Sequence, residues 1–437
     1  MKIVIAGAGI GGLTFAAKAK AGEHEIVVYE TAPSEEAMRY EWHDDVSPEA
    51  FRRAGFDIPE GSFPKKDWTF VAPDGATVRR IYEDPSRADI SVWRRKLNEE
   101  LIRRAKSNAR IVFGRRAESL VVENGRVAGI VADGEKIHAD LVIDSTGADS
   151  VLKRDINVTR HEPDEIFEVY RAFYRKDPAA PEAEYTNKVY LKQMGESGIA
   201  WAIQDGDTVD VLIGRVGEMG EETLSRALRR IKEENPTVGD EIVMGGGIYR
   251  IPVRYPATRM VADGYAAIGD AAYMTIPMLG SGIASSMAAA ETLVNVVYSA
   301  LAEGKSAREA ASKENLWKYE VAFYRETGAE HAGVDVMKRG VLDMPDDIVT
   351  WLLGSDILTN EEVCRLAKGK PIILGAADSL KKAAVAGIGK LPVLLKVNSM
   401  LMRVSKAIRT ARRIPENYSE EAVARWERKL VRAVTGK

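Results

Sequence analysis

The first twelve residues of the chain, MKIVIAGAGIGG (1–12), carry its strongest structural signal. An apolar, β-branched run at 3–5 predicts a buried parallel strand, and a helical pattern follows the glycines. Gly7, Gly9 and Gly12 have the spacing G-x-G-x-x-G. At this spacing the first glycine makes a tight turn, the second lets the backbone approach a pyrophosphate, and the third lets the helix pack against the strand. Because a helix start offers N–H groups and a partial positive charge, the stretch predicts a dinucleotide site.

An acidic residue follows at the position that such a site requires. The second predicted strand, at 25–29, leads into Glu30, about 20 residues after the glycines. Its carboxylate can accept hydrogen bonds from a ribose 2′-OH, and it disfavours NADP because it would repel the 2′-phosphate. The pattern therefore fits the AMP half of FAD or NAD. The alternative is a glycine-rich turn that binds nothing.

Composition bounds the class of protein. The 437 residues are 45% hydrophobic and 29% charged, which indicates a globular chain with a large core and two or three domains. The net charge of −3 gives no general attraction to nucleic acid. The single cysteine, Cys364, excludes an internal disulfide and favours a reducing, cytoplasmic location. We expect no signal peptide, no membrane span and, because the five histidines lack ligand spacing, no metal site.

A second glycine-rich stretch lies far along the chain, at 264–283. A predicted buried strand ends in Gly269-Asp270, a loop with Gly280 and Gly282 follows, and then a helix of small residues begins. Asp270 can accept a hydrogen bond from a sugar hydroxyl, and the glycine N–H groups can face a pyrophosphate or an anionic flavin edge. The alternative is an ordinary strand–helix turn in which Asp270 caps a helix.

Together these stretches resemble one family. The N-terminal glycines, Glu30, the segment R-x-x-L-N-x-x-L from Arg94 and G-D-A-A-x4-P-x-x-G-x-G from Gly269 are similar to FAD-dependent oxidoreductases of the glutathione-reductase structural class. Within that class they resemble the branch that holds aromatic-ring hydroxylases, flavin halogenases and geranylgeranyl reductases. The resemblance spans roughly residues 1–300 and implies FAD as the cofactor.

The resemblance also implies an α/β fold with a Rossmann-type FAD-binding domain, an antiparallel-sheet substrate domain and a helical C-terminal region. We expect the FAD-binding domain at 1–65, 88–160 and 255–300, the substrate domain at 66–87 and 161–254, and the helical region at 301–437.

Individual positions take roles from the same resemblance. It implies that Arg94 lies along the ribityl–phosphate chain, that Ala117 offers its backbone to the adenine, and that Asp270 binds the ribityl region. Gly282 and Ile283 are expected beside the isoalloxazine. The full set expected to bind FAD is Gly7, Ala8, Gly9, Ile10, Gly11, Gly12, Glu30, Thr31, Arg94, Ala117, Gly147, Gly269, Asp270, Gly280, Ser281, Gly282 and Ile283.

One motif departs from the family pattern. Hydroxylases carry an Asp-Gly pair that serves both FAD and NAD(P)H, whereas this chain has DSTGADS at 144–150. A second dinucleotide fingerprint is also missing, since the glycines at 245–247 precede no clear helix. We therefore expect no stable NAD(P)H domain. The reductant is either NAD(P)H that docks transiently, a deazaflavin, or a reduced protein such as ferredoxin.

Two residues are candidates for catalysis. Trp201, in GIAWAI at 198–203, partly matches the tryptophan segments of geranylgeranyl reductases and halogenases; packing on the core is the alternative. Where geranylgeranyl reductases place a Cys-Gly element facing the flavin, this chain has RYEWHDD at 39–45. His43 could protonate a carbanion formed by hydride addition, oriented by Asp44 or Asp45. The alternative for this segment is a polar surface loop.

Two further features bear on the substrate. Arg254 is a candidate for binding an acidic substrate group, with a surface salt bridge as the alternative. The stretch 381–413 contains nine Lys or Arg residues among apolar ones and no Asp or Glu. A cationic amphipathic stretch predicts peripheral contact with a membrane surface, which suits a lipid substrate. The alternative is a helical cap that packs its apolar face on the core.

We therefore predict an FAD-dependent oxidoreductase that reduces C=C bonds of an isoprenoid or similar hydrophobic substrate by hydride transfer from reduced flavin. The alternative enzyme is a flavin-dependent aromatic hydroxylase, monooxygenase or halogenase, in which reduced flavin reacts with O₂. A third possibility is a non-catalytic lipid-binding protein of the same fold.

Overall fold

The computed structural model describes residues 1–20, 22–38, 43–65, 67–192, 197–373, 382 and 388–436. Two parts of the sequence-based expectations lie outside these ranges. They are residues 39–42 of the segment that contains His43, and residues 381 and 383–387 of the basic stretch.

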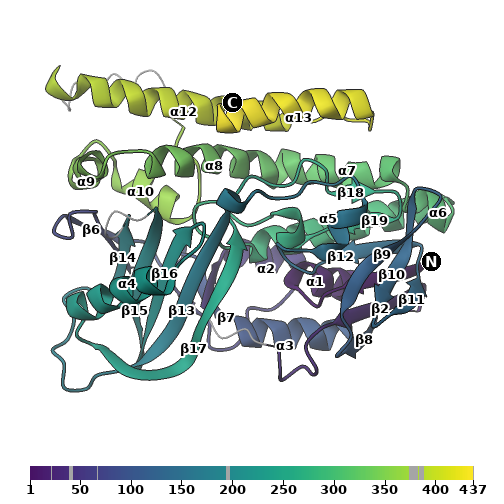
Figure 1. The fold of residues 1–437 in the computed structure, drawn as a ribbon, viewed down its shortest axis with the longest axis horizontal. Coiled ribbons are helices and arrows are strands. Elements are labelled where there is room, and N and C mark those ends of the chain that lie inside the picture. Colours follow the sequence, from purple (N-terminus) through teal and green to yellow (C-terminus); the bar gives the residue numbers. More distant parts are fainter. Residues whose placement is uncertain are drawn as a thin grey trace.

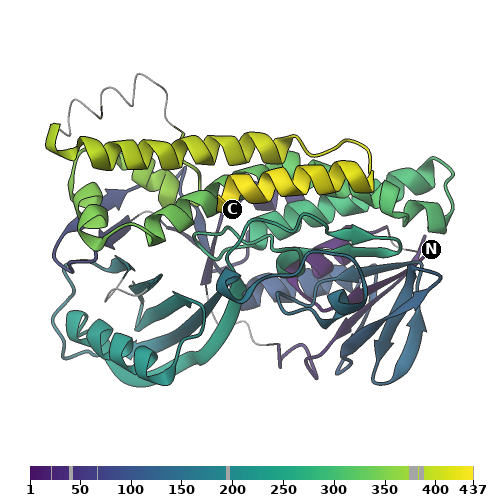
Figure 2. The ribbon, with the colours of Figure 1, turned by 45° about the horizontal axis from the view of Figure 1, so that its top comes forward.

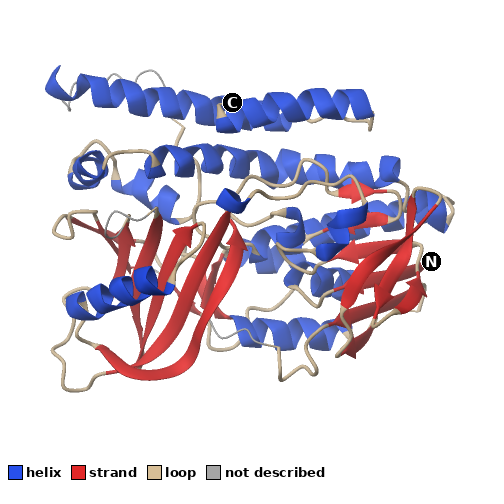
Figure 3. Ribbon diagram, viewed as in Figure 1, coloured by secondary structure: helices blue, strands red, loops and turns tan. Residues whose placement is uncertain are grey.

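A six-stranded sheet forms the core of the part that carries both glycine-rich loops (Figure 3). Its order is β18-β19-β12-β1-β2-β8, and every pair is parallel except β18–β19. Ile3, Val4 and Ile5 of the central strand are fully buried, as expected for a parallel strand covered on both faces. The strands are β1 (Lys2–Ala6), β2 (Glu25–Glu30), β8 (Arg110–Phe113), β12 (Leu141–Asp144), β18 (Val261–Ala262) and β19 (Tyr265–Ala267).

Three helices pack together beside this sheet. Helix α1 (Ile10–Lys18) contacts both α3 (Arg94–Ala105) and α5 (Ile283–Ala302). The sequence predicts a helix after Gly12, at Leu13. α1 begins three residues earlier, at Ile10, with Gly9 as its N-cap. The two helices that follow the glycine-rich loops are therefore neighbours, although their sequences lie far apart.

A seven-stranded sheet lies beside the six-stranded sheet in Figure 1. Its order is β17-β13-β16-β15-β14-β5-β6, and all pairs are antiparallel except β14–β5. Helix α4 (Glu221–Glu234) packs Ala227 and Ile231 on one face. The strands are β5 (Asp67–Val71), β6 (Val78–Tyr82), β13 (Ile166–Lys176), β14 (Asn187–Leu191), β15 (Gly198–Asp205), β16 (Thr208–Val216) and β17 (Val238–Pro252).

The glycines at 245–247 lie inside β17, where the pairing with β13 shifts register. β5 and β6, from the predicted range 66–87, join the strands from 161–254 in this one sheet. We propose that this sheet belongs to a substrate domain at 66–87 and 161–254.

Two small sheets complete the strands. One is β3 (His43–Val46), β7 (Ile90–Trp93) and β4 (Phe63–Pro64); the other is β9 (Ala117–Glu123), β10 (Arg126–Ala132) and β11 (Glu135–His138). His43 therefore does not lie in a polar surface loop, which was the alternative for its segment, because β3 pairs along its length with β7. Helix α2 (Pro48–Ala54) follows β3 directly.

Helices make up most of the chain after β19. They are α6 (Ala307–Ala310), α7 (Lys313–Phe323), α8 (Ala329–Leu342), α9 (Asp346–Gly354), α10 (Asn360–Ala367), α12 (Leu391–Arg412) and α13 (Glu420–Thr435). Figures 1 and 2 show α12 and α13 as an outer layer over α7 and α8. α12 buries Val404 and Ile408 on this layer, whereas Leu391 and Leu395 nearer its start are exposed. None of the described helices combines the length and the apolar character needed to cross a bilayer.

Candidate functional site

The two glycine-rich loops meet at one edge of the six-stranded sheet. The carboxyl ends of β1, β12 and β19 lie side by side there, which is where parallel sheets bind nucleotides. Gly9 and Gly282 are the N-cap residues of α1 and α5. Neither helix has a capping side chain or an acidic residue in its first turn. Two helix starts therefore present N–H groups to the same space, which suits an anionic ligand.

A cavity of about 670 Å³ extends from these loops. Its polar end is bounded by the glycine-rich loops. Its other end is apolar and is lined by strands of the seven-stranded sheet, including Phe70 and Val189, and by α8 to α10, including Val341, Leu352 and Val363. The cavity thus joins the dinucleotide-binding part to a space suited to a hydrophobic molecule.

The structure brings most of the predicted site residues to this cavity. Those that line it are Gly7, Gly9, Ile10, Gly11, Glu30, Thr31, His43, Arg94, Gly147, Trp201, Gly269, Asp270, Gly280, Ser281, Gly282 and Ile283. Ala8, Gly12 and Ala117 do not line it. Ala117 is buried at the start of β9, opposite Ala132, so its suggested contact with adenine stays a prediction.

At Gly7, Gly9 and Gly12 a side chain would collide with neighbouring atoms. Gly7 has φ of +86°, and a Cβ there would lie 2.5 Å from the carbonyl oxygen of Ser145. A Cβ at Gly9 would lie 2.7 Å from Ser145 Oγ, and one at Gly12 would lie 2.8 Å from Ile5 Cγ2. Gly12 therefore serves close packing of helix on strand, while the backbone at Gly9 forms the cavity wall.

Glu30 is held in place by the backbone. Its Oε2 accepts a hydrogen bond from the Ala8 N–H at 2.7 Å, and its Oε1 accepts one from the Ala32 N–H at 2.8 Å. This explains why Ala8 contributes without lining the cavity. The carboxylate stands at the cavity wall, where it can also accept a hydrogen bond from a sugar hydroxyl.

A buried carboxylate organises the loop that departs from the family pattern. Asp144 is fully buried and accepts hydrogen bonds from Thr146 N and Oγ1, at 3.0 and 2.7 Å. Ser150 Oγ and the Tyr265 hydroxyl donate to its other oxygen, at 2.5 and 2.7 Å. These bonds fold 144–150 into a closed loop, and Ser145 to Gly147 line the cavity as a result.

Arg94 and Asp270 lie close to the polar end. Arg94, the first residue of α3, donates from Nη1 to Asp44 Oδ2 at 2.8 Å. Asp270 Oδ1 accepts a hydrogen bond from Thr275 Oγ1 at 2.9 Å. Burial raises the pKa of Asp270 from its ordinary value. Asp44 is thus engaged by an arginine and is not available to orient His43.

The partner of His43 differs from the prediction. Its Nδ1 lies 3.3 Å from Asp205 Oδ2 on β15 and 3.4 Å from Ser91 Oγ, so neither Asp44 nor Asp45 orients the ring. Burial is the main influence and lowers the pKa of His43, although Asp205 acts in the opposite direction.

Trp201 lines the cavity and packs against the apolar cluster that contains Phe70 and Val189. The guanidinium carbon of Arg171 lies 5.2 Å from the centre of its ring. Arg171 itself is buried, with Nε and Nη2 on the two carboxylate oxygens of Asp210 and a further bond to the His43 carbonyl oxygen. Within the described residues, the indole Nε1 of Trp201 has no hydrogen-bond partner. Trp201 therefore lines the cavity and packs on a buried ion pair.

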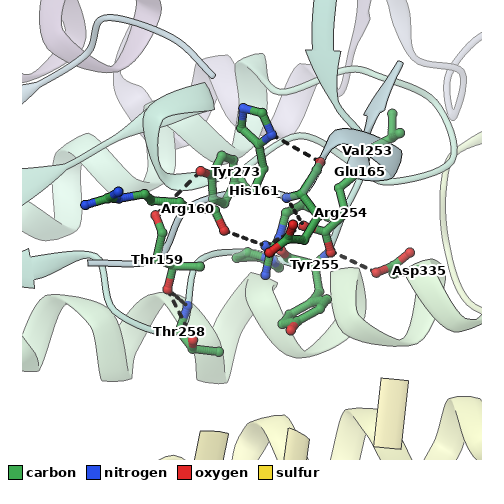
Figure 4. A network of polar contacts seen from close by, with 12 residues as sticks. Thr159, Arg160, His161, Glu165, Val253, Arg254, Tyr255, Thr258, Tyr273 and Asp335 are labelled. Atoms are coloured by element: carbon green, nitrogen blue, oxygen red, sulfur yellow. Dashed lines mark hydrogen bonds and ion pairs between the residues drawn. The ribbon is translucent and has the colours of Figure 1, made fainter. Parts of the chain in front are cut away.

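Arg254 does form a salt bridge, but the bridge is buried rather than at the surface, and the side chain does not reach the cavity where a substrate group would bind. Its side chain is buried, does not line the cavity, and donates from Nη1 to Glu165 Oε2 at 2.7 Å (Figure 4). The next residue, Tyr255, donates its N–H to Asp335 of α8. Arg254 therefore belongs to a buried polar network that ties the end of β17 to the C-terminal helices.

Some cavity residues had no sequence signal of their own. Asp45, Lys65, Asp89 and Lys368 form a charged part of the wall, and the apolar lining of α8 to α10 comes from a region recognised only as helical. Asp45 was visible only as a possible orienting group for His43. Lys65 and Asp89 lie in segments without periodic patterns, so only the fold shows that they face the cavity.

Comparison with known proteins gives the family. A family model described as "Lycopene cyclase protein" matches residues 2–162. The digeranylgeranylglycerophospholipid reductase of Methanothrix thermoacetophila is 30% identical over 68% of this chain and 75% of its own length. The chain belongs to the digeranylgeranylglycerophospholipid reductase family. The family member from Sulfolobus acidocaldarius is 20% identical over 99% of this chain and 97% of its own.

Solved structures share the fold of this chain. A geranylgeranyl bacteriochlorophyll reductase-like protein from Thermoplasma acidophilum superposes with a TM-score of 0.73 at 20% identity, over 92% of this chain and 98% of its own. The flavin-dependent halogenase CmlS has a TM-score of 0.60 at 17% identity, over 100% of this chain and 77% of its own. The resemblance, the fold class and the assignment to an enzyme family of FAD-dependent oxidoreductases are therefore confirmed for this digeranylgeranylglycerophospholipid reductase family member.

Proposed function

We propose that the protein binds FAD at the polar end of the cavity and reduces C=C bonds of a polyprenyl lipid that occupies the apolar end. The observation that carries the proposal is the continuity of the two ends: one cavity is lined both by the glycine-rich loops and by the apolar side chains of α8 to α10. The names of the relatives, reductases of digeranylgeranylglycerophospholipid, support a substrate of this class.

The residues at the polar end fit FAD. The backbone at Gly9 approaches the cavity so closely that no side chain could be added without meeting Ser145. The starts of α1 and α5 would hold the pyrophosphate and the flavin edge, and Glu30 the adenosine ribose. Arg94 and Asp270 would hold the chain between them. When bound, the flavin supplies hydride transfer.

The protein's own part is to place the lipid and keep water away. Side chains such as Leu352 and Val363 would surround a polyprenyl chain, and Trp201 would mark the point where the chain reaches the flavin. We propose that the reductant is not held in a domain of its own, and docks transiently as NAD(P)H, a deazaflavin or ferredoxin.

The test is an anaerobic reaction with a chemically reduced enzyme. FAD-loaded protein is reduced with dithionite and mixed with digeranylgeranylglycerophospholipid, and the lipid is analysed by mass spectrometry. We expect the lipid mass to rise by one H₂ for each double bond reduced. A lipid of unchanged mass would contradict the proposal. If an air pulse on the reduced protein then gave the absorbance of a flavin hydroperoxide, the monooxygenase or halogenase alternative would replace it.

We further propose peripheral contact with a membrane through the described part of 381–413. Leu391, Leu395 and Met402 expose 44, 62 and 61% of their surface on α12. The helix carries Lys396 and Arg403 among them and ends in a run of basic residues, so it is suited to anionic headgroups. The protein would then take its lipid substrate directly from a bilayer.

Replacing the three exposed side chains, Leu391→Ser, Leu395→Ser and Met402→Ser together, is expected to weaken vesicle binding at least tenfold. Each apolar side chain that leaves water for the bilayer interface contributes on the order of 1 kcal/mol. Flotation with vesicles of anionic phospholipid measures the effect. The matched control is Ile242→Ser with Ile248→Ser, two equally exposed residues on β17, at 47 and 51%. Equal binding by both variants would contradict the assignment to α12.

A further inference from the structure

Strand β3 brings a carboxyl group to the cavity beside the second glycine-rich loop. Asp45 lines the cavity together with Ser281, whose hydroxyl donates to the Asp45 carbonyl oxygen at 3.3 Å. Because the proposed flavin edge lies along 280–283, Asp45 stands at the reacting end of the cavity. The cofactor-binding set assigned above does not include it.

The carboxyl group has charged neighbours on several elements. Lys65, directly after β4, places Nζ 3.7 Å from Asp45 Oδ1, and its ammonium also lies 5.0 Å from the Trp68 ring centre. Asp44 of β3 and the Arg171–Asp210 pair of the seven-stranded sheet also face it. Burial is the largest influence and raises the pKa of Asp45, while Lys65 and Arg171 act against it.

A second carboxyl group lies at the end of the same small sheet. Asp45 pairs with Ser91 of β7, and Asp89 comes directly before β7. Asp89 lines the cavity as well, and its backbone carbonyl accepts the Lys65 N–H at 2.8 Å. Burial is the largest influence on Asp89 and raises its pKa to about 6.

His43 is less suited to give a proton. It precedes Asp45 by two residues and lines the same cavity, but its Nδ1 is directed at Asp205. Only a protonated group can act as the acid in a reduction. Asp45 lines the cavity beside the loop at 280–283, whereas Nδ1 of His43 is directed at Asp205 of the seven-stranded sheet.

We propose that Asp45 is the catalytic acid of the reduction and that Asp89 returns the proton to it. This inference rests on the proposed function. When bound, the reduced flavin would supply a hydride to one carbon of the double bond and be oxidised by the transfer. The proton of Asp45 would go to the other carbon as the π electrons form the second C–H bond, so that the alkene becomes an alkane. The Asp45 carboxylate would regain its proton from water by way of Asp89.

The first measurement does not need cofactor or substrate. An infrared pH titration of the cofactor-free protein follows the carbonyl stretch of protonated carboxylic acids. We expect wild type to keep a carboxylic acid signal above the pH at which ordinary aspartates lose it, and Asp45→Asn to lack one such signal. An identical titration of the two proteins overturns the proposal, provided that circular dichroism shows both folded.

The second measurement uses the FAD-loaded enzyme and digeranylgeranylglycerophospholipid. Asp45→Asn is expected to bind FAD as wild type does and to reduce the lipid at least 100-fold more slowly, since a positioned acid contributes about 10²–10⁴ in rate. Asp45→Glu is expected to restore part of the rate. In wild type the rate falls as the pH rises through the raised pKa of Asp45, and this fall is absent from Asp45→Asn.

The control variant is Asp205→Asn, which removes the carboxylate beside His43. If His43 were the acid, this variant would move the alkaline limb of the pH profile and Asp45→Asn would not, and the proposal would be overturned. Failure of the wild type to reduce the lipid counts against the proposed function instead. A lipid-reducing wild type with an equally fast Asp45→Asn variant counts against Asp45 alone.

Discussion

Replacing Gly9 with valine is expected to abolish FAD binding. Gly9 has φ of −71°, which valine adopts without strain, so the effect comes from the added atoms alone. A Cβ at this position already lies 2.7 Å from Ser145 Oγ and 3.0 Å from the Ser145 carbonyl oxygen. The remaining methyl groups project at the start of α1, into the space proposed for the pyrophosphate.

The measurement is a titration with FAD, followed by absorbance, together with thermal unfolding in its presence. A ligand at 100 times its Kd stabilises a protein by about 2.7 kcal/mol, and the Gly9→Val variant should lose this gain completely. Gly220→Val is the matched control: Gly220 is also a helix N-cap, has φ of −64°, and has open space around the added atom. Binding of FAD by Gly9→Val with a Kd within threefold of wild type would place the pyrophosphate elsewhere.

Removing the Asp144 carboxylate is expected to destabilise the protein by about 3–5 kcal/mol, because it leaves several buried hydrogen-bond donors without an acceptor. Alanine at this position leaves the hydroxyls of Thr146, Ser150 and Tyr265 without their acceptor in the interior. Each buried donor without a partner costs about 1–3 kcal/mol. The loop 144–150 would open at the same time, so FAD binding should weaken as well.

Urea unfolding of Asp144→Ala measures the loss. Asp74→Ala is a close control. Asp74 also accepts hydrogen bonds from the N–H and the hydroxyl of a threonine, Thr77, three residues further along the chain, but it lies at the exposed surface. Its loss should change the free energy of unfolding by no more than about 1 kcal/mol. If the two variants were destabilised equally, burial would not be the reason for the importance of Asp144.

The parts of the site that could be predicted from the sequence depend on local patterns. The first strand, the loop at Gly7 to Gly12 and Glu30 follow one another within a single βαβ unit, so their spacing alone fixes their geometry. The loop at 280–283 is equally local. Resemblance to a family supplied Arg94, because nothing in its own segment indicates a cavity.

The parts that could not be predicted depend on pairing between distant segments. β3 meets β7 across more than forty residues, and this pairing turns Asp45 and Asp89 toward one cavity. The Asp205 partner of His43 comes from β15, in the other sheet. The side chains of α8 to α10 have ordinary core composition, and only packing decides that some of them enclose a space rather than fill it.

The way the cavity is assembled has a consequence for how the protein is made. Its walls come from the first residues of the chain, from the loop before α5, and from α8 to α10. A growing chain emerges with its N-terminus first, so the loop at Gly7 to Gly12 leaves the ribosome long before the residues that enclose the other side of the cofactor space. A nascent chain that ends before α5 has only one of the two helix starts. Loading with cofactor must therefore follow synthesis of most of the polypeptide, and a truncated chain would remain colourless even where its N-terminal βαβ unit had folded.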